Sequence, residues 1–405
     1  MINQARALSD IGAERVPDGW ELSTVGKSCQ IKNNIRFPLS VEERKKMKGQ
    51  YPYFGPTGCL DMINEYRVEG RFALIGEDGD HFVDFNGKPQ TQIVSGKFNV
   101  NNHAHVIGET QSCTVDWFFY SFHHRRLTPH LSRQGAGRYK LNKASLEKIP
   151  MLVPPLPEQR KIAEILSTWD AAIEKTEALL ATAKAQKRAL MQSLLTGKRR
   201  FPEFEGQEWK EVRLGDVFSR VRRKNTVGND NVLTISAQHG LVSQEKYFNK
   251  RVAAKDLSGY TLLHHGDFAY NKSYSQGYPL GAIKMLEVDE PGVVSSLYLC
   301  FALTDESSNC REYFRHFFEA GRFNHEIYKI AQEGARNHGL LNVSSTDFFR
   351  AQINVPLLAE QQKIAAVLKD AEGQIAEHAQ SVEKLRAEKK ALMQQLLTGK
   401  RRVVV

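Results

Sequence analysis

VPPLPEQRKIAEIL opens residues 153–200, which end in KRALMQSLLTGKRR. VPLLAEQQKIAAVL opens residues 355–402, which end in KKALMQQLLTGKRR. The two stretches align without a gap, and roughly half of their positions are identical. Self-similarity of this extent indicates a duplicated structural unit, so the sequence predicts a chain that is built twice from one plan.

Each stretch is predicted to form one long helix. Pro157 and Glu158 suit the start of a helix, where proline is tolerated and a carboxylate faces the positive end of the helix dipole. Gly197 and Gly399 stand where C-terminal caps are expected, and Lys-Arg-Arg follows each of them. About 40 residues without proline separate these signals, which corresponds to ~60 Å of helix at ~1.5 Å per residue.

Apolar residues recur along each stretch at alternating steps of four and three, which is the spacing of a heptad seam. The seam runs Ile162, Leu166, Trp169, Ile173, Thr176, Leu180, Ala183, Lys187, Leu190, Leu194 in the first stretch and Ile364, Leu368, Ala371, Ile375, His378, Val382, Leu385, Lys389, Leu392, Leu396 in the second. A helix of this length does not bury such a stripe alone, and a pseudo-twofold axis exchanges two helices head to tail. We therefore expect an intramolecular antiparallel coiled coil.

The segments that precede the two helical repeats have a different pattern. Short strand-like runs such as residues 72–75 and 232–235 are separated by many glycines and asparagines. Trp20 and Trp209 open similar stretches, which weakly relates the two segments. We predict an α+β fold with pseudo-twofold symmetry. Its parts are strand-rich domains at 1–152 and 205–354 and helical repeats at 153–204 and 355–405.

The chain carries a formal net charge of +10, which favours nucleic acid or an acidic partner. Most of the surplus positive charge lies in the helical repeats, so any DNA binding by the two domains must come from local clusters. The local clusters are residues 123–126, 133–140 and 220–225, and residues 270–276 interleave aromatic, amide and basic groups. Solvated surface loops are the alternative interpretation of each cluster.

Nothing in the composition indicates a membrane or an oxidising compartment. No apolar run reaches the ~18 residues of a membrane span, and residues 1–20 lack the apolar segment of a secretory signal. The five cysteines are scattered and never spaced as Cys-x-x-Cys, which argues against a disulfide framework and a thiolate zinc site. We expect a reduced, cytoplasmic protein.

Motifs for catalysis are weak. Residues 26–28 (Gly-Lys-Ser) end like a phosphate-binding loop, but Glu21 stands where the first glycine of that loop belongs. The Asn/Asp-Pro-Pro-aromatic motif of adenine methyltransferases is absent, and so is a Gly-rich cofactor fingerprint. We therefore expect no catalytic residue in this chain.

Candidate metal ligands are equally isolated. His103 and His105, and the histidine pair at 264–265, lack a convincing set of partners. Acidic residues 77–84, with Lys88 close by, leave open a self-contained magnesium-dependent nuclease. We favour a chain without a metal site.

Two motifs in the helical repeats carry a family resemblance. Glu-Gln followed by Lys-Ile-Ala stands near the start of each repeat (158–163 and 360–365), and Leu-Leu-Thr-Gly-Lys stands at the end (194–198 and 396–400). The chain thereby resembles the specificity subunits of type I restriction–modification systems. The duplicated plan and the length match this family too, so the resemblance covers essentially the whole chain.

The resemblance implies a non-catalytic subunit with two target recognition domains. Each domain would read one half of a split site in double-stranded DNA, and the two helices would be the spacer. The implied partners are two methyltransferase subunits and, optionally, two restriction or translocase subunits. Those partners would carry S-adenosylmethionine, ATP and magnesium, whereas this chain would bind no cofactor and no membrane.

Aligning the two domains by eye suggests which residues face DNA. Residues 77–79 align with 271–273, and residues 55–58 align with 237–240. The candidate DNA-binding residues are Thr57, Arg138, Tyr139, Arg222, Arg223, Gln238, Asn271, Lys272, Ser273, Arg336, Asn337 and His338. Two alternatives remain open: a coiled-coil scaffold whose domains bind protein, and a solitary specificity subunit that redirects or inhibits another system.

Overall fold

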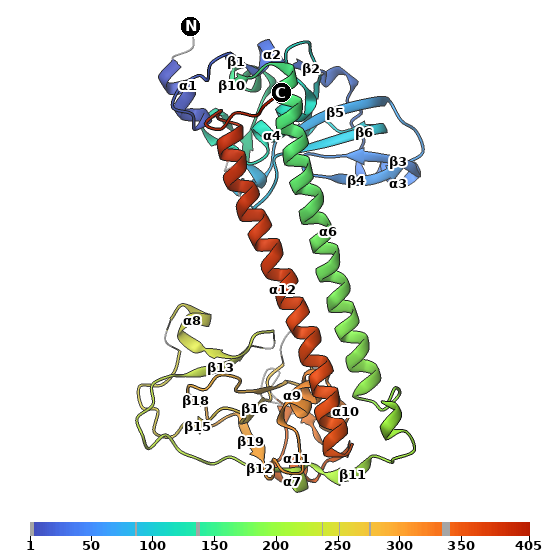
Figure 1. The fold of residues 1–405 in the computed structure, drawn as a ribbon, viewed down its shortest axis with the longest axis vertical. Coiled ribbons are helices and arrows are strands. Elements are labelled where there is room, and N and C mark those ends of the chain that lie inside the picture. Colours follow the sequence, from blue (N-terminus) through green and yellow to red (C-terminus); the bar gives the residue numbers. More distant parts are fainter. Residues whose placement is uncertain are drawn as a thin grey trace. The chain divides into compact units, whose positions relative to one another are not determined.

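The computed structural model describes residues 4–85, 87–134, 138–236, 238–250, 252–274, 277–333 and 341–405. The chain divides into two compact units: unit 1 is Met1–Ala178 with Gln380–Val405, and unit 2 is Leu179–Ala379. Two long helices, α6 (Leu156–Leu194) and α12 (Leu358–Leu396), each contribute to both units (Figure 1). The predicted α+β fold class and the two long helices are confirmed.

Unit 1 is built on one six-stranded sheet with the strand order β2-β7-β5-β6-β3-β4. Its strands are β2 (Gln30–Ile31), β3 (Lys48–Phe54), β4 (Cys59–Ile63), β5 (Val68–Gly76), β6 (Thr91–Val100) and β7 (Ala104–Gly108). Helix α4 (Val115–Phe122) packs on β5 and β6. Its aromatic residues Trp117 and Phe118 are buried there, which places the core of unit 1 between this helix and the sheet.

Shorter elements complete unit 1. They are α1 (Gln4–Ile11), α2 (Val25–Ser28), α3 (Val41–Lys46), α5 (Lys143–Lys148), the antiparallel pair β1 (Glu21–Thr24) with β10 (Pro150–Val153), and the antiparallel pair β8 (Ser132–Gln134) with β9 (Arg138–Lys140). The β1–β10 pair joins the start of the strand-rich segment to the residues that lead into α6.

Unit 2 has a four-stranded sheet with the order β12-β19-β16-β17. These strands are β12 (Phe218–Arg220), β16 (Phe268–Asn271), β17 (Ala282–Met285) and β19 (Leu299–Leu303). The helices are α7 (Leu214–Val217), α8 (Gln244–Phe248), α9 (Arg311–Glu319), α10 (Asn324–Ile330) and α11 (Ser345–Arg350). The paired strands are β11 (Lys210–Arg213) with β22 (Gln352–Val355), β13 (Leu233–Ser236) with β14 (Gly240–Ser243), β15 (Thr261–Leu263) with β18 (Gly292–Val294), and β20 (Gln332–Glu333) with β21 (Leu341–Asn342).

The two units repeat one core arrangement. The order β2-β7-β5-β6 in unit 1 corresponds to β12-β19-β16-β17 in unit 2, and the pair β1–β10 corresponds to β11–β22. The residues before α4 and α9 also bind equivalent glutamines. Thr114 donates its N–H to Gln159 Oε1 at 2.9 Å, and Cys310 donates its N–H to Gln361 Oε1 at 2.8 Å. The internal duplication that the helical repeats predicted therefore extends through both strand-rich segments.

The two long helices run antiparallel in each unit. In unit 1, Arg386 of α12 pairs with Glu177 of α6 at 2.7 Å, and Lys389 pairs with Asp170. In unit 2, Lys187 of α6 pairs with Glu372 of α12 at 2.7 Å. Later residues of α6 thus pair with earlier residues of α12, as antiparallel helices require. None of the helices in the described residues combines the length and the apolar character of a membrane span.

A lysine occupies one seam position in each helix. Lys389 is buried, and its partner Asp170 also accepts a hydrogen bond from the hydroxyl of Tyr120 at 2.8 Å. Lys187 has the equivalent partner in Glu372. A charge in an apolar seam is tolerated when its counter-charge stands in register, so these two pairs favour one alignment of the helices.

The start of one repeat contacts the end of the other repeat inside each unit. In unit 1, Arg402 binds both oxygens of Glu158 at 2.7 and 2.8 Å, and Trp20 Nε1 donates to the same carboxylate at 2.9 Å. Unit 2 repeats this arrangement with Arg200, Glu360 and Trp209. Glycine makes the approach possible because Gly197 and Gly399 both adopt a φ of +68°, as the predicted caps require. The Glu-Gln and Gly-Lys-Arg-Arg motifs therefore form the junction between helix and domain.

A network of charges joins α9 to α12 in unit 2. Arg315 of α9 binds both oxygens of Glu372 at 3.1 and 2.6 Å. His316 is fully buried, and its Nδ1 lies 3.6 Å from Glu319 and 3.7 Å from Glu372. These three side chains have the spacing of possible metal ligands, but Arg315 and Lys187 already provide both carboxylates with cations. We interpret the network as the polar attachment of α9 to the helix pair.

Because of this network, the free energy of unfolding of unit 2 is expected to fall at acidic pH. Burial opposes the charge on Glu319, but contact with His316 and the charges of Lys187 and Lys284 outweigh it and lower its pKa from 4.5 to about 2. The unfolded chain therefore takes up the proton first as the pH falls. The stability that this carboxylate contributes is complete above pH 4.5 and is lost as the pH falls through about 2.

Glu319→Gln should therefore make the free energy of unfolding of unit 2 less dependent on pH across that interval. Urea unfolding at several acidic pH values measures this dependence. Glu290→Gln is the matched control, because Glu290 is an exposed carboxylate of the same unit. An acid dependence in Glu319→Gln equal to that of the control would contradict the prediction.

Candidate nucleic-acid interface

Basic and polar residues follow two parallel strands of the four-stranded sheet in unit 2. β12 and β16 both run antiparallel to β19, which lies between them, so they are parallel to each other, and Arg220 at the end of β12 is level with Phe268 at the start of β16. Arg220 ends β12 and Arg222 follows it, whereas Asn271 ends β16 and is followed by Lys272 and Ser273. We call these five residues the unit 2 edge. Four of the five are predicted DNA-binding residues, and the fifth, Arg220, was not among the predictions.

Hydrogen bonds direct the long side chains of the unit 2 edge. Lys272 Nζ donates to the carbonyl of Val343 at 3.3 Å, and Arg220 Nη1 donates to the hydroxyl of Ser345 at 3.3 Å. The carbonyl of Lys272 accepts from the N–H of Leu341 at 3.0 Å. Both cations are thus held against the same short segment that leads into α11.

Among the residues that the structure describes, the positive charge of the unit 2 edge has no acidic partner. No ion pair joins Arg220, Arg222 or Lys272 to a carboxylate within the described part of the chain. Burial lowers the pKa of the Lys272 ammonium, and repulsion from Arg220 lowers it further. Because like charges repel and burial weakens their hydration, an external anion would stabilise this arrangement. The unit 2 edge therefore has the electrostatic character of an anion site.

Arg223 differs from its neighbour Arg222, although the sequence groups the two. Its guanidinium forms an ion pair with the buried Asp267 and donates to the carbonyl of Leu262 at 3.4 Å. Asp267 also accepts from the N–H of His264 at 2.7 Å. Consecutive side chains of an extended chain point to opposite faces, which separates the two arginines. Both arginines are exposed, but Arg223 is held in an ion pair of the fold, whereas no ion pair joins Arg222 to a carboxylate among the described residues.

Unit 1 has the corresponding edge, where β2 and β5 flank β7. Glu77 follows the last residue of β5 and takes the central place at this edge. It pairs with Arg36 at 2.7 Å and with Lys140 at 3.1 Å. Burial opposes its charge, but the hydrogen bond from Arg36 and the nearby cations outweigh burial and lower its pKa. We call Glu77, Arg36 and Lys140 the unit 1 edge; its positive charges are compensated within the fold.

Backbone hydrogen bonds establish which residues of the two edges correspond. The N–H of Leu141 donates to the carbonyl of Glu77 at 2.7 Å, as the N–H of Leu341 does to the carbonyl of Lys272 at 3.0 Å. Glu77 is therefore the counterpart of Lys272. The alignment by eye, which paired Glu77 with Asn271, is wrong by one residue because side-chain similarity does not fix strand register.

Known proteins resemble this chain in sequence. A family model described as the type I restriction modification DNA specificity domain matches residues 17–184. The chain is 24% identical over 363 residues to a putative type I restriction enzyme specificity subunit of Haemophilus influenzae, covering 88% of this chain and 89% of the relative. It is 25% identical over 420 residues to a type I restriction enzyme specificity subunit of Methanocaldococcus jannaschii, covering 96% and 94%.

The chain is thus similar, over most of its length, to specificity subunits of type I restriction–modification systems. The fold is similar too. The crystal structure of a type I restriction–modification system S subunit from M. genitalium is similar with a TM-score of 0.59 at 12% identity, covering 95% of this chain and 97% of that one.

Four other predicted DNA-binding residues lie outside the two edges. Thr57 is exposed in the turn between β3 and β4, and Gln238 is exposed in the turn between β13 and β14. Arg138 and Tyr139 lie on β9, where Tyr139 is half-buried. The predictions that lie outside the described residues are Arg336, Asn337 and His338.

The acidic segment at 77–84 does not have the arrangement of a nuclease site. Asp78 pairs with His103 at 2.9 Å, and Asp80 pairs with Lys88 at 2.5 Å. Among the described residues, these carboxylates do not converge into a group of three metal ligands. The segment stabilises the loop after β5 and gives no support to the nuclease alternative.

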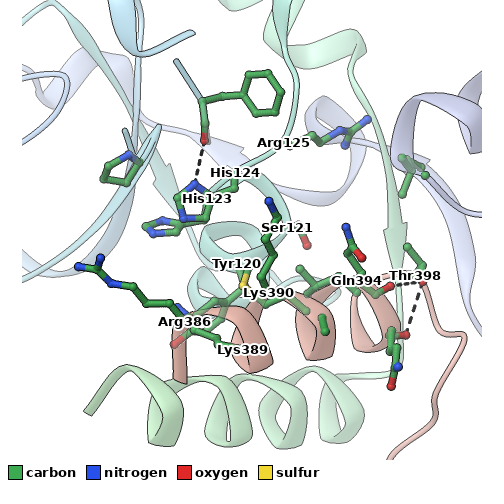
Figure 2. A pocket seen from close by; sticks show the side chains of 18 of the residues that line it. Tyr120, Ser121, His123, His124, Arg125, Arg386, Lys389, Lys390, Gln394 and Thr398 are labelled. Carbon is green, nitrogen blue, oxygen red and sulfur yellow. Dashed lines mark hydrogen bonds between the residues drawn. The ribbon is translucent and has the colours of Figure 1, made fainter. Parts of the chain in front are cut away.

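A cavity of 960 Å³ lies in unit 1 beside the C-terminal end of α4 (Figure 2). Figure 2 shows His123 and His124 lining it together with α12 side chains such as Lys390 and Gln394. Burial lowers the pKa of His123 to about 3, so this imidazole is neutral near pH 7. Several of the cations that line the cavity already have carboxylate partners inside unit 1. Arg125, Arg386, Lys389 and Lys400 are thereby compensated, whereas no ion pair joins the lining residue Lys390 to a carboxylate among the described residues.

Proposed function

We propose that this chain is a specificity subunit that reads a bipartite site in double-stranded DNA, with one unit on each half. The observation that carries the proposal is the repeated sheet: in unit 2 its strands lead into Arg220, Arg222, Asn271 and Lys272, and in unit 1 the corresponding position holds Glu77 with Arg36 and Lys140. Lys and Arg neutralise phosphates, and Asn and Arg form paired hydrogen bonds with base edges. In this proposal, α6 and α12 are the spacer that sets the separation of the half-sites.

The proposal extends to partners. The subunit would recruit two methyltransferase subunits and, optionally, two restriction or translocase subunits in the cytoplasm. S-adenosylmethionine, ATP and magnesium would belong to those partners, and this chain would contribute recognition without catalysis. The relatives support this division of labour, because they are named as specificity subunits.

Sequencing of modified bases in genomic DNA tests the reading function directly. Cells that carry this gene with a methyltransferase partner should have N6-methyladenine on both strands of one split motif. Deletion of the gene should abolish methylation of that motif, because the methyltransferase would lose its reader. A plasmid copy of the wild-type gene should restore the methylation and serves as the control.

An unchanged pattern of methylation after deletion would contradict the proposal. DNA binding by the purified chain then separates the two alternatives. A scaffold that binds only protein would show no affinity for duplex DNA, whereas a solitary specificity subunit would bind DNA with a steep dependence on salt.

A further inference from the structure

The two edges differ in how their positive charge is balanced. Arg36 and Lys140 of unit 1 hold the carboxylate of Glu77 between them, at 2.7 and 3.1 Å. In unit 2, Arg220 and Lys272 have no carboxylate partner in the described part of the chain. The same backbone position therefore carries a neutralised acid in unit 1 and, in unit 2, a cation without a carboxylate partner among the described residues.

The cations of unit 2 also retain unused donors. Lys272 Nζ can donate three hydrogen bonds, and the one that the structure gives it runs to the carbonyl of Val343. Arg220 has five donor N–H groups, and Nη1 makes a hydrogen bond with Ser345 at 3.3 Å. Because Val343 and Ser345 are two residues apart, the remaining donors of both cations are available beside one short segment.

We infer that Arg220 and Lys272 together hold a backbone phosphate of DNA, and that the carboxylate of Glu77 occupies the corresponding anion position in unit 1. The inference rests on the proposed reading function and assigns the phosphate contact to unit 2 alone. A phosphate fits the site because it accepts several hydrogen bonds and balances the two charges at once. Glu77 provides the same balance internally, so unit 1 makes no phosphate contact at its own edge.

The phosphate contact in unit 2 should affect how DNA binding depends on salt concentration. A cation that neutralises a phosphate releases counterions from DNA, and each phosphate so neutralised changes the slope of log K against log salt by about 0.9. Loss of the contact in unit 2 should flatten the slope and weaken binding to all sequences alike, since a phosphate carries no base identity. Removal of the charge of Glu77 should act in the opposite direction, because it frees Arg36 and Lys140 for phosphate.

The test uses the full chain and a 30-base-pair duplex of random sequence, with the dissociation constant measured at a series of salt concentrations. Arg220→Gln/Lys272→Gln should weaken binding about tenfold or more at low salt and lower the slope by about 1. Lys272→Arg retains the charge and should remain close to wild type. The matched control is Lys329→Gln, which removes an exposed positive charge elsewhere in unit 2.

For unit 1, Glu77→Gln should strengthen binding and raise the slope by about 1, relative to Glu69→Gln. Glu69 is an exposed carboxylate of the same unit, so the control makes the same change in net charge. Circular dichroism of each variant verifies that it is folded. Competition with inorganic phosphate at constant ionic strength identifies the ligand: weak competition supports a DNA phosphate, and displacement at low millimolar phosphate indicates a free phosphate and overturns the assignment.

The possible failures are distinct. If the wild-type chain does not bind duplex DNA, the proposed function fails and the inference fails with it. If the wild type binds but Arg220→Gln/Lys272→Gln behaves like Lys329→Gln, the phosphate contact is overturned while the reading function stands. If Glu77→Gln behaves like Glu69→Gln, the role of Glu77 as the internal anion is overturned.

Discussion

Replacement of Glu360 by alanine should lower the free energy of unfolding of unit 2 by about 3–5 kcal/mol, which is the typical effect of removing one partner from a buried ion pair. The side chain of Glu360 is 1% exposed. It accepts hydrogen bonds from Arg200 Nε at 2.9 Å, Arg200 Nη2 at 2.5 Å and Trp209 Nε1 at 3.1 Å. Alanine would leave the guanidinium partly buried without an anion and the indole N–H without an acceptor.

Urea unfolding of the variant, followed by the signal of unit 2, measures this loss. Glu203→Ala is the matched control because Glu203 pairs with Lys363 on the surface, where both side chains are nearly half exposed. The control should change stability by no more than about 1 kcal/mol. A double-mutant cycle of Glu360→Ala with Arg200→Ala should reveal strong coupling. A loss below about 1 kcal/mol in Glu360→Ala would be inconsistent with a buried junction.

Truncation of the chain after Ala379 should unfold unit 1 while unit 2 stays folded. The removed segment, Gln380–Val405, belongs to unit 1, although the whole of unit 2 separates it in sequence from the rest of unit 1. It contributes Met393 and Leu396 to the core of unit 1, and Arg402 to the buried Glu158. Burial of each large apolar side chain contributes about 1.5–3 kcal/mol, and an unpaired buried carboxylate costs several more. The sum approaches the 5–15 kcal/mol of an ordinary domain.

Hydrogen exchange resolves the two units in one measurement. In the truncated chain, amides of β5 and β6 should lose protection, whereas those of β16 and β19 should retain it. Removal of Val404 and Val405 alone is the control, because both are largely exposed. Full protection of β5 in the truncated chain would show that the strand-rich part of unit 1 folds without the second helix.

The candidate interface illustrates where reasoning from sequence reached its limit. The basic cluster at 220–225 was evident, but only pairing with β19 separated its members. Arg223 pairs with the buried Asp267, whereas no ion pair joins Arg222 to a carboxylate in the described part of the chain. Arg220 was in the cluster yet outside the predicted site, because its place on the edge depends on a strand that is about fifty residues away in sequence. Strand neighbours are set by non-local hydrogen bonds, which no local pattern encodes.

The sequence by itself determined the duplication, the two long helices, their caps and their antiparallel pairing. These features follow from local rules: heptad spacing, helix-terminal residues and the similarity of the two repeats. Tertiary structure alone decided that Glu158 and Glu360 are junction residues and that Glu77 and Lys272 hold the same backbone position. Both facts depend on contacts between segments far apart in the chain, where burial and backbone hydrogen bonding select the partner.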